Sequence, residues 1–516
     1  MFGQNTLGGA LSIITKNGFT HPGHSLEVFG GSVDRSVSTV ETGVNKGSLG
    51  YFATASYFNE EGWRDASPSD ALNFFGSVGW HTESTTLDLN VSHGDTELVG
   101  NGPVPVELLG RERAAIFTSP DITRNFMQMV DLEAAHWLTD AVQVAGHLYY
   151  RWNDIESFNG DGTPFVECGE PTHLGRLCFD DARLGTAAET VALDQNGNAL
   201  SKDFDAINNL STRSQRSYGG SLQATFMKQL FEHQNQFIVG FSYNQGLFDF
   251  ESSVEAATLL ADRSTSRTGL FIPDDATRVS GRTRTWSGYL TDTLSVTDKL
   301  DLTFSGRFNS TRVMIDDPSG QDPGLNGEHE FERFNPAAGI TYQFGAGLSL
   351  YGSYSESSRA PTTVELSCAR PDAPCNLPNA FLADPPLKQV VAKGFEGGLR
   401  GKLKSISGVD LGAVSWTLGY FETTNKDDII FQSTGGITSN RGFFANIGDT
   451  RRRGMELGIH GESGKLAWYT NYSFVQATFE DAFSSSSPSH PAANANGDVA
   501  VRKGNRIPGI PEHSLK

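Results

Sequence analysis

Residues 452–479, RRGMELGIHGESGKLAWYTNYSFVQATF, decide the fold class of this chain. Two runs in which apolar and polar residues alternate flank a polar turn at residues 461–465. Because successive side chains of a β-strand point to opposite faces, each run predicts a strand with one apolar and one more polar side. The second run continues for about 14 residues, well beyond the usual strand of about 5–6. Its length and its row of aromatic residues are typical of a strand that crosses a membrane in a β-barrel.

The same alternating unit recurs along the whole chain. Seventeen such runs can be placed, and an eighteenth begins at His513. They lie at about 25–32, 35–46, 49–60, 72–82, 84–96, 125–138, 141–154, 215–229, 233–247, 283–297, 299–313, 331–344, 347–357, 391–403, 412–424, 441–460 and 464–480.

The connections between these runs alternate in length. Short turns, such as 46–48, 230–232 and 461–464, alternate with connections that are mostly long. The long ones are 61–71, 97–124, 155–214, 248–282, 314–330, 358–390, 425–440 and 481–512. In an up-and-down meander, alternate connections lie at opposite ends of the sheet. All short turns should therefore share one rim, as in outer-membrane barrels, which combine tight periplasmic turns with long extracellular loops.

The predicted fold is therefore all-β, a transmembrane antiparallel up-and-down β-barrel. Bacterial single-chain barrels have an even number of strands and must close, because an open edge in lipid leaves backbone groups unpaired. Seventeen strands and the start of another predict that the sequence lacks the last strands of its barrel. The opening residues 1–4 have no features of a signal peptide, so we also expect the sequence to begin within a longer protein.

Composition narrows the classes of partner. The chain of 516 residues has a mean hydropathy of −0.33 and no apolar run long enough for a transmembrane helix. The formal net charge of −20 argues against a nucleic-acid partner, which requires a basic face. Outer-membrane lipid is the partner that the alternating strands predict.

Several segments, in this order, resemble the TonB-dependent outer-membrane receptors, in particular the siderophore receptors. They are GQNTLGGALSIITK at 3–16, NPAAGITY at 335–342, LSLYGSYSESSRAPTTVEL at 348–366, DPPLK at 384–388, NIG at 446–448, RGMEL at 453–457, NYS at 471–473 and IPGIPEH at 507–513. The residues that carry the family motifs are Leu7, Gly8, Gly9, Ile13, Arg359, Ala360, Pro361, Asn446, Gly454 and Glu456.

The resemblance implies a barrel of about 22 strands whose lumen is plugged. Residues 1–20 would be the C-terminal end of the plug domain and residues 21–516 a barrel incomplete at its C-terminus. It also implies energised uptake of a ferric siderophore or another iron chelate across the Gram-negative outer membrane. The energy-coupling protein TonB would be the partner of the full-length receptor, although its binding box is absent here. A passive porin, a soluble secreted β-protein, and TonB-dependent uptake of cobalamin or glycans are the alternatives.

Four cysteines fall into two close pairs within long connections. Cys168 and Cys178 lie in one connection, and Cys368 and Cys375 in another, which predicts two local disulfides of an oxidising compartment. A thiolate metal site is the alternative, but neither pair has the C-x2-C spacing of a zinc site, and only His173 lies between the first two cysteines.

Few side chains are candidates for ligand contact, metal binding or catalysis. Arg111, Arg113 and Arg359 are candidates for contact with an anionic ligand in the vestibule of the barrel. Acidic pairs in the loops are expected to be solvated charge, with a divalent-cation site as the alternative. We predict no catalytic residues, no metal site and no cofactor, since no nucleophile with a base and an orienting group stands out. The family resemblance implies that a haem receptor would carry a histidine in the loop between Pro361 and Pro385. No histidine lies there, so a haem ligand is disfavoured.

Overall fold

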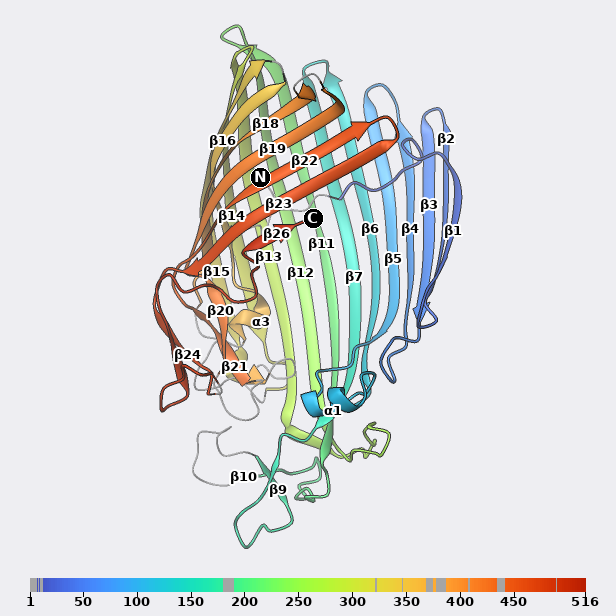
Figure 1. Ribbon diagram of the computed structural model, residues 1–516, viewed down its shortest axis with the longest axis vertical. Helices are drawn as coiled ribbons and strands as arrows, with labels where there is room; N and C mark the ends of the chain where they lie inside the picture. The colour runs from blue at the N-terminus through green and yellow to red at the C-terminus, as the bar shows by residue number, and fades with distance from the viewer. Residues whose placement is uncertain are drawn as a thin grey trace.

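A computed structural model of the chain describes residues 7, 9, 13–179, 190–320, 323–345, 347–367, 375–376, 387–406, 409–433, 441–488 and 490–516. Eighteen strands join in one sheet, which curves into a tall wall (Figure 1). Each wall strand pairs antiparallel with the wall strands before and after it, so the topology is the predicted up-and-down meander. The first and last strands, β1 and β26, are the two edges of the wall in this structure.

The wall strands differ greatly in length. They are β1 (Gly23–Gly30), β2 (Ser36–Lys46), β3 (Leu49–Glu60), β4 (Ser69–His81), β5 (Thr85–Val99), β6 (Asp121–Thr139), β7 (Val142–Gly162), β11 (Ala206–Leu230), β12 (His233–Ala257), β13 (Phe271–Thr297), β14 (Leu300–Asp316), β15 (Gly327–Gly345), β16 (Leu348–Arg359), β18 (Val390–Ile406), β19 (Val409–Lys426), β22 (Thr450–Ser463), β23 (Leu466–Phe479) and β26 (His513–Leu515).

Smaller elements lie in the connections. They are α1 (Val106–Arg111), β8 (Val166–Glu167), β9 (Leu177–Phe179), β10 (Thr190–Val191), η1 (Pro323–Leu325), α3 (Thr363–Leu366), β17 (Cys375–Asn376), β20 (Ile429–Ser433), β21 (Arg441–Asn446), β24 (Phe483–Ser486) and β25 (Asp498–Val501). None of the helices among the described residues has the length and apolarity that crossing a membrane requires.

The two faces of the wall differ as the alternation predicts. On β5, the side chains of Leu87, Leu89 and Val91 share one face and are exposed, whereas Asn90 points to the other face and is buried. Asn90 donates from its amide to Asp131 Oδ2 at 2.9 Å, which links it to the neighbouring strand. An apolar outer face over a polar interior is the pattern of a wall surrounded by lipid.

Short and long connections are sorted between the two rims, as predicted. Tight turns such as the one at Gly47, with φ +66°, join the strands at the upper end in Figure 1. The long connections, with α1, α3 and the small sheets, lie at the lower end, which we call the long-loop rim.

One predicted strand, 441–460, is wrong as a single element. It is divided into β21, which belongs to a small sheet with β17 and β20, and β22, which belongs to the wall. Gly448 stands between them with φ +96°, and its carbonyl accepts from the backbone N–H of Asp428. This left-handed glycine turns the chain out of the wall, so the alternation on either side does not make one strand.

The central strands extend much farther than predicted. β11 and β12 have 25 residues each and β13 has 27, whereas about 9–11 tilted residues suffice to cross the hydrocarbon. A strand of this length spans roughly 80 Å at about 3.3 Å per residue. These strands therefore continue well beyond the membrane at the long-loop rim, and the connection predicted at 248–282 shrinks to residues 258–270.

A buried apolar cluster closes part of the long-loop rim. Leu366 of α3 packs with Val313 and Ile315 of β14 and with Val390 of β18. Leu7, from the start of the chain, packs against the same cluster. The N-terminal residues that the structure describes therefore contact the concave side of the wall.

The packing on the concave side of the wall can be tested at Gly454 on β22. A Cβ there would lie 2.1 Å from the carbonyl oxygen of Phe474 and 2.9 Å from the ring of Phe421. We expect Gly454→Ala to destabilise the folded chain by about 1–3 kcal/mol through overpacking. The thermal midpoint in detergent can be measured from the change in mobility on a denaturing gel after heating.

The matched control is Gly246→Ala on β12. A Cβ at Gly246 meets nothing within 4 Å, so this variant should keep the wild-type midpoint. Equal behaviour of the two variants would contradict the packing argument.

Candidate functional site

The long-loop rim holds the first candidate region, a cap formed by residues 163–179 and 190–205. The cap contains a three-stranded sheet, β8–β9–β10. Its Phe165, Leu177 and Phe179 form one buried cluster with Ile207 and Ile272 of the extended wall strands. The cap is thus attached to the projecting strands by its own apolar core.

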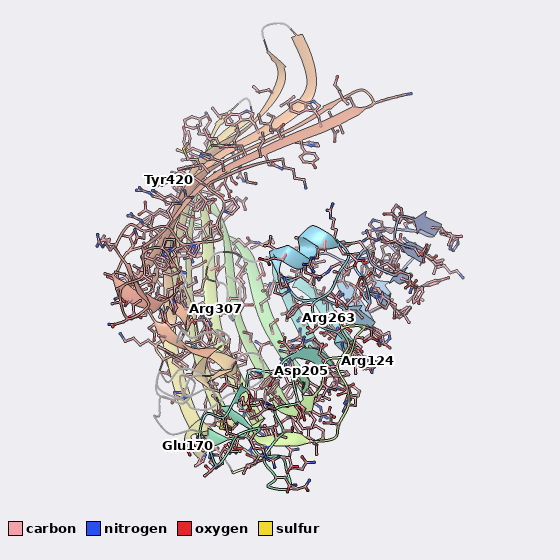
Figure 2. The ribbon with its side chains drawn as sticks, turned by 60° about the horizontal axis from the view of Figure 1, so that its bottom comes forward. Arg124, Glu170, Asp205, Arg263, Arg307 and Tyr420 are labelled. Atoms are coloured by element: carbon pink, nitrogen blue, oxygen red, sulfur yellow. A yellow bond between two sulfur atoms is a disulfide. The ribbon has the colours of Figure 1, made fainter. Side chains whose placement is uncertain are left out.

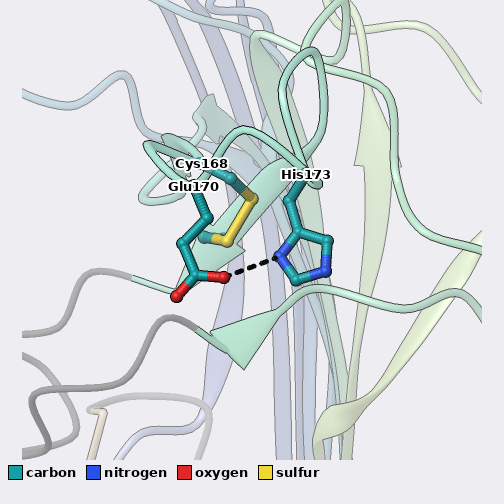
Figure 3. The surroundings of a disulfide bond; sticks show 4 residues. Cys168, Glu170 and His173 are labelled. Carbon is teal, nitrogen blue, oxygen red and sulfur yellow. Dashed lines mark ion pairs between the residues drawn. A yellow bond between two sulfur atoms is a disulfide. The ribbon is translucent and has the colours of Figure 1, made fainter.

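A disulfide between Cys168 and Cys178 lies inside this cap (Figure 3). Both cysteines are buried, and beside them Glu170 Oε2 lies 3.9 Å from Nδ1 of His173. The loop that the bond closes is short, so the constraint on the unfolded chain is about 2–3 kcal/mol. Of the second predicted pair, Cys368 lies outside the described residues, and nothing is described of the Cys375 side chain.

A buried carboxylate fastens the connection 258–270 to the projecting strands. Glu255 on β12 has only 1% of its side chain exposed and pairs with Arg267 Nε at 2.6 Å. It also accepts from the backbone N–H of Thr268 and Gly269 and from the Asn208 amide. Burial alone would raise the pKa of this carboxyl, but these hydrogen bonds and the charge of Arg267 hold the pKa below its ordinary value.

Arg111 and Arg113 lie in the neighbouring connection, at and just after the end of α1. The guanidinium of Arg113 stands 5.9 Å from the ring centroid of Trp63, which is itself exposed. Arg64 ties the two connections together, because its guanidinium donates to the carbonyls of Asn101, Gly102 and Ala115. The two predicted arginines are thus exposed to solvent at the rim, and Arg113 lies next to an aromatic side chain.

Arg359 has a structural setting that the sequence did not reveal. Its guanidinium makes a bidentate ion pair with the Glu365 carboxylate, with N–O distances of 2.6 and 2.9 Å. Glu365 also accepts from the backbone N–H of Thr362 and completes the capping box of α3. Arg359 therefore holds the start of α3 to the end of β16, and its contact with a ligand stays a prediction.

The remaining motif residues have distinct places. Asn446 links two connections, since its amide donates to the carbonyls of Lys388 and Asp427 and its oxygen accepts from the Lys388 N–H. Pro361 is fully buried beside α3, next to the half-buried Ala360. Ile13 is exposed, and Gly8 lies outside the described residues.

The concave side of the wall carries a hollow of about 500 Å³. Leu7 and Gly9 line it together with Glu456, Tyr351 and Arg307. The hydroxyl of Ser357 donates to the carbonyl of Leu7 at 3.4 Å. Three motif residues that are distant in sequence, Leu7, Gly9 and Glu456, thus meet inside the wall.

Three other side chains on the concave side could hold a metal ion. Asp131 and Glu133 on β6 and His147 on β7 each offer one donor atom, and these atoms lie within 4.8 Å of one another. This group is not predicted from the sequence, because Glu133 and His147 face each other only through the pairing of β6 with β7. An alternation template could place each residue inside the barrel but not the two side by side.

With this geometry in view, a comparison with protein families identifies the chain. The model of the family described as TonB dependent receptor-like, beta-barrel matches residues 61–516. The chain belongs to this TonB-dependent receptor family. The curved wall is therefore a TonB-dependent receptor barrel, and the predicted fold class is confirmed.

Solved structures share the receptor fold at low sequence identity. The ferric-catecholate import receptor Fiu of Escherichia coli K12 is 14% identical, with a TM-score of 0.70 over 98% of this chain and 70% of that one. The siderophore receptor PiuA of Acinetobacter baumannii is also 14% identical, with a TM-score of 0.68 over 99% and 71%. The pyoverdine outer membrane receptor FpvA of Pseudomonas aeruginosa is 15% identical, with a TM-score of 0.63 over 89% and 62%. No curated protein matches the receptor sequence.

The Glu255 contacts lead to a pH dependence at the rim of the receptor. Glu255 lies 22 residues from the short turn at His233, so it is beyond the membrane-spanning part of β12. Because the pKa of Glu255 is lower in the folded state, the ionised carboxylate stabilises the folded loop. This contribution is complete above the ordinary carboxyl pKa of about 4.3. This contribution is lost as the pH falls through the lower, folded-state value. We expect protection of amides 258–270 from hydrogen exchange to fall below about pH 4.

Two variants check this assignment. Glu255→Gln should lower protection at neutral pH and remove the acid dependence. Glu251→Gln, which alters an exposed carboxylate paired with Arg278 at 3.4 Å, should leave both unchanged. If protection from hydrogen exchange still falls with acid in Glu255→Gln, another group causes the acid response.

Proposed function

We propose that this receptor takes up a scarce ligand across the Gram-negative outer membrane, with energy supplied through TonB. The family match over most of the wall carries this proposal, together with the long connections, whose described residues lie at one rim. The long-loop rim would face outward and the short turns the periplasm, because outer-membrane barrels are oriented in this way.

The proposed ligand is a ferric siderophore or another iron chelate. Fiu is described as a ferric-catecholate import receptor, PiuA as a siderophore receptor and FecA as a ferric citrate transporter. The exposed Arg113 beside Trp63 supplies positive charge at the rim of a chain whose net charge is −20. Such a local cation suits the anionic chelates that most siderophores form with iron.

A copper ligand is the second candidate. The copper transporter OprC shares the fold with a TM-score of 0.60 at 14% identity. The group of Asp131, Glu133 and His147 adds an imidazole and two carboxylates inside the barrel, and imidazole is a good ligand for copper. Cobalamin, glycans and passive diffusion are the remaining alternatives from the sequence.

We also propose that residues 1–20 are the end of a plug domain and residues 21–516 the barrel. The contact of Leu7 with Ser357 and with the buried cluster supports a segment that lies inside the barrel. TonB would act on the plug of the full-length receptor.

Uptake can be tested in cells. The gene that encodes the full-length receptor would be expressed in a Gram-negative host whose own iron-chelate receptors have been deleted. We expect accumulation of radioactive iron from at least one member of a panel of catecholate, hydroxamate and citrate chelates. The same host without TonB should accumulate none, since the transport is energised.

Two results would contradict the proposal. Equal uptake with and without TonB would indicate passive diffusion. Uptake of copper but of no iron chelate would replace the first ligand by the second.

The rim arginines allow a test of ligand contact. Arg113→Ala removes an exposed guanidinium beside Trp63, and a lost charged hydrogen bond costs about 1.5–3 kcal/mol. We expect the affinity for the transported chelate to fall at least tenfold, measured by fluorescence quenching on purified receptor. Arg312→Ala, which removes an exposed rim arginine paired with Glu328, is the control and should bind as the wild type does. A loss of the same size in both would point to general electrostatics.

A further inference from the structure

Three potential metal ligands meet on the concave side of the wall, where β6 pairs with β7. Asp131 and Glu133 are two residues apart on β6, so their side chains point to the same face. His147 on β7 stands directly opposite Glu133. One donor atom of each side chain lies within 4.8 Å of the other two. Two carboxylates and one imidazole therefore converge on a small region of the barrel interior.

Strand pairing holds these residues in place. The register of β6 with β7 continues without a slip from Asp121 to Trp137. Residues that oppose each other in an antiparallel pair have Cβ atoms about 4.5–5.5 Å apart, so the backbone alone keeps Glu133 beside His147. Sites built on strands are positioned more precisely than sites on loops.

Neighbouring side chains orient two of the ligands. Asn90 on β5, which is 7% exposed, stands opposite Asp131 and donates from its amide to Asp131 Oδ2 at 2.9 Å. The His147 ring stacks on Tyr149, with the ring centroids 5.8 Å apart. The Tyr149 hydroxyl donates in turn to Asn244 Oδ1 at 3.0 Å. Supporting contacts behind the ligands are typical of metal sites, because they fix the orientation of each donor.

The ligands border a hollow that has room for water. His147 and Tyr149 line this hollow, which has a volume of about 540 Å³. An ion held by three protein ligands keeps at least one position for water or another small ligand. The hollow can supply that position.

The charge on this part of the wall favours a cation. Asp88 on β5 stands opposite Glu133 and pairs with His81 Nε2 at 2.8 Å, so three carboxylates lie on two adjacent strands. Arg307 is the cation among the described residues that line the hollow, and it lies on β14, four strands along the sheet from β7 (Figure 2). Its guanidinium donates to Ser242 Oγ at 3.0 Å. The carboxylates therefore dominate the charge beside the imidazole.

We propose that Asp131, Glu133 and His147 bind one divalent transition-metal ion inside the barrel. Imidazole suits zinc, copper and nickel, whereas calcium and magnesium prefer sites made of oxygen. Zinc binds both kinds of donor at about 2.0–2.2 Å, so the ligands of one ion lie about 3–4 Å apart. Small side-chain rotations close the difference from the 4.8 Å of this group. The site goes beyond the proposed uptake, because it binds a hydrated ion whichever chelate the receptor carries.

Zinc is a suitable probe, since it has no redox chemistry. Isothermal titration of Zn²⁺ into the purified full-length receptor, in detergent and without a histidine tag, should show saturable binding. His147→Gln should weaken this binding at least tenfold. Asp131→Asn should do the same, although it keeps an oxygen that can accept from Asn90. The control is His136→Gln, because His136 lies on the other face of β6, 2.8 Å from Thr85 Oγ1, and this variant should bind zinc within twofold of wild type.

Competition by calcium does not require any variant to fold. A large excess of Ca²⁺ should leave zinc binding to the wild-type receptor unchanged, because the imidazole selects against calcium. Displacement of zinc by calcium would indicate diffuse negative charge and would overturn the assignment. Absence of zinc binding to the wild-type receptor, or equal binding to a folded His147→Gln variant, would overturn it as well. Each of these results leaves iron uptake unaffected, and a receptor that carries no iron chelate would still bind zinc here.

Discussion

The hydrogen bonding of the backbone in lipid is the constraint on which this structure depends. Hydrocarbon offers no partner to an N–H or C=O group, so a chain that crosses with strands must pair each strand with a neighbour. The meander satisfies this requirement with antiparallel neighbours that are also consecutive wall strands. Once backbone pairing is fixed in this way, side chains need only sort between lipid and interior, and the period of two follows.

Because the period of two follows from the lipid surroundings, the wall strands could be predicted from the sequence within the membrane but not beyond it. The hairpin of β22 and β23 shows both faces in its residue pattern, and its register runs without a slip from Ser463 opposite Leu466 to Thr450 opposite Phe479. Residues 206–214, by contrast, were assigned to a loop although they continue β11. Outside lipid nothing enforces alternation on a strand, so the projecting ends of β11, β12 and β13 have no such signature.

The functional side chains were harder to predict, because their roles arise from neighbours far away in the sequence. Arg359 was recognised by its motif, yet its ion pair with Glu365 follows from the turn that begins α3. Arg307 lies at an inward position of β14, but its contacts with Ser242 and Tyr289 are visible only when β12, β13 and β14 stand side by side. Alternation identifies the face on which a residue lies, whereas chemistry depends on what faces it.

The cap and the wall are stabilised in different surroundings, the cap in water and the wall in lipid or detergent. The wall is held by its surroundings of lipid or detergent, while Phe165, Leu177 and Ile207 pack in a core that exists because water surrounds it. Aqueous denaturants act on the second kind of packing, and bilayer composition acts on the first. The cap at the long-loop rim can therefore be remodelled residue by residue without disturbing how the barrel sits in its membrane.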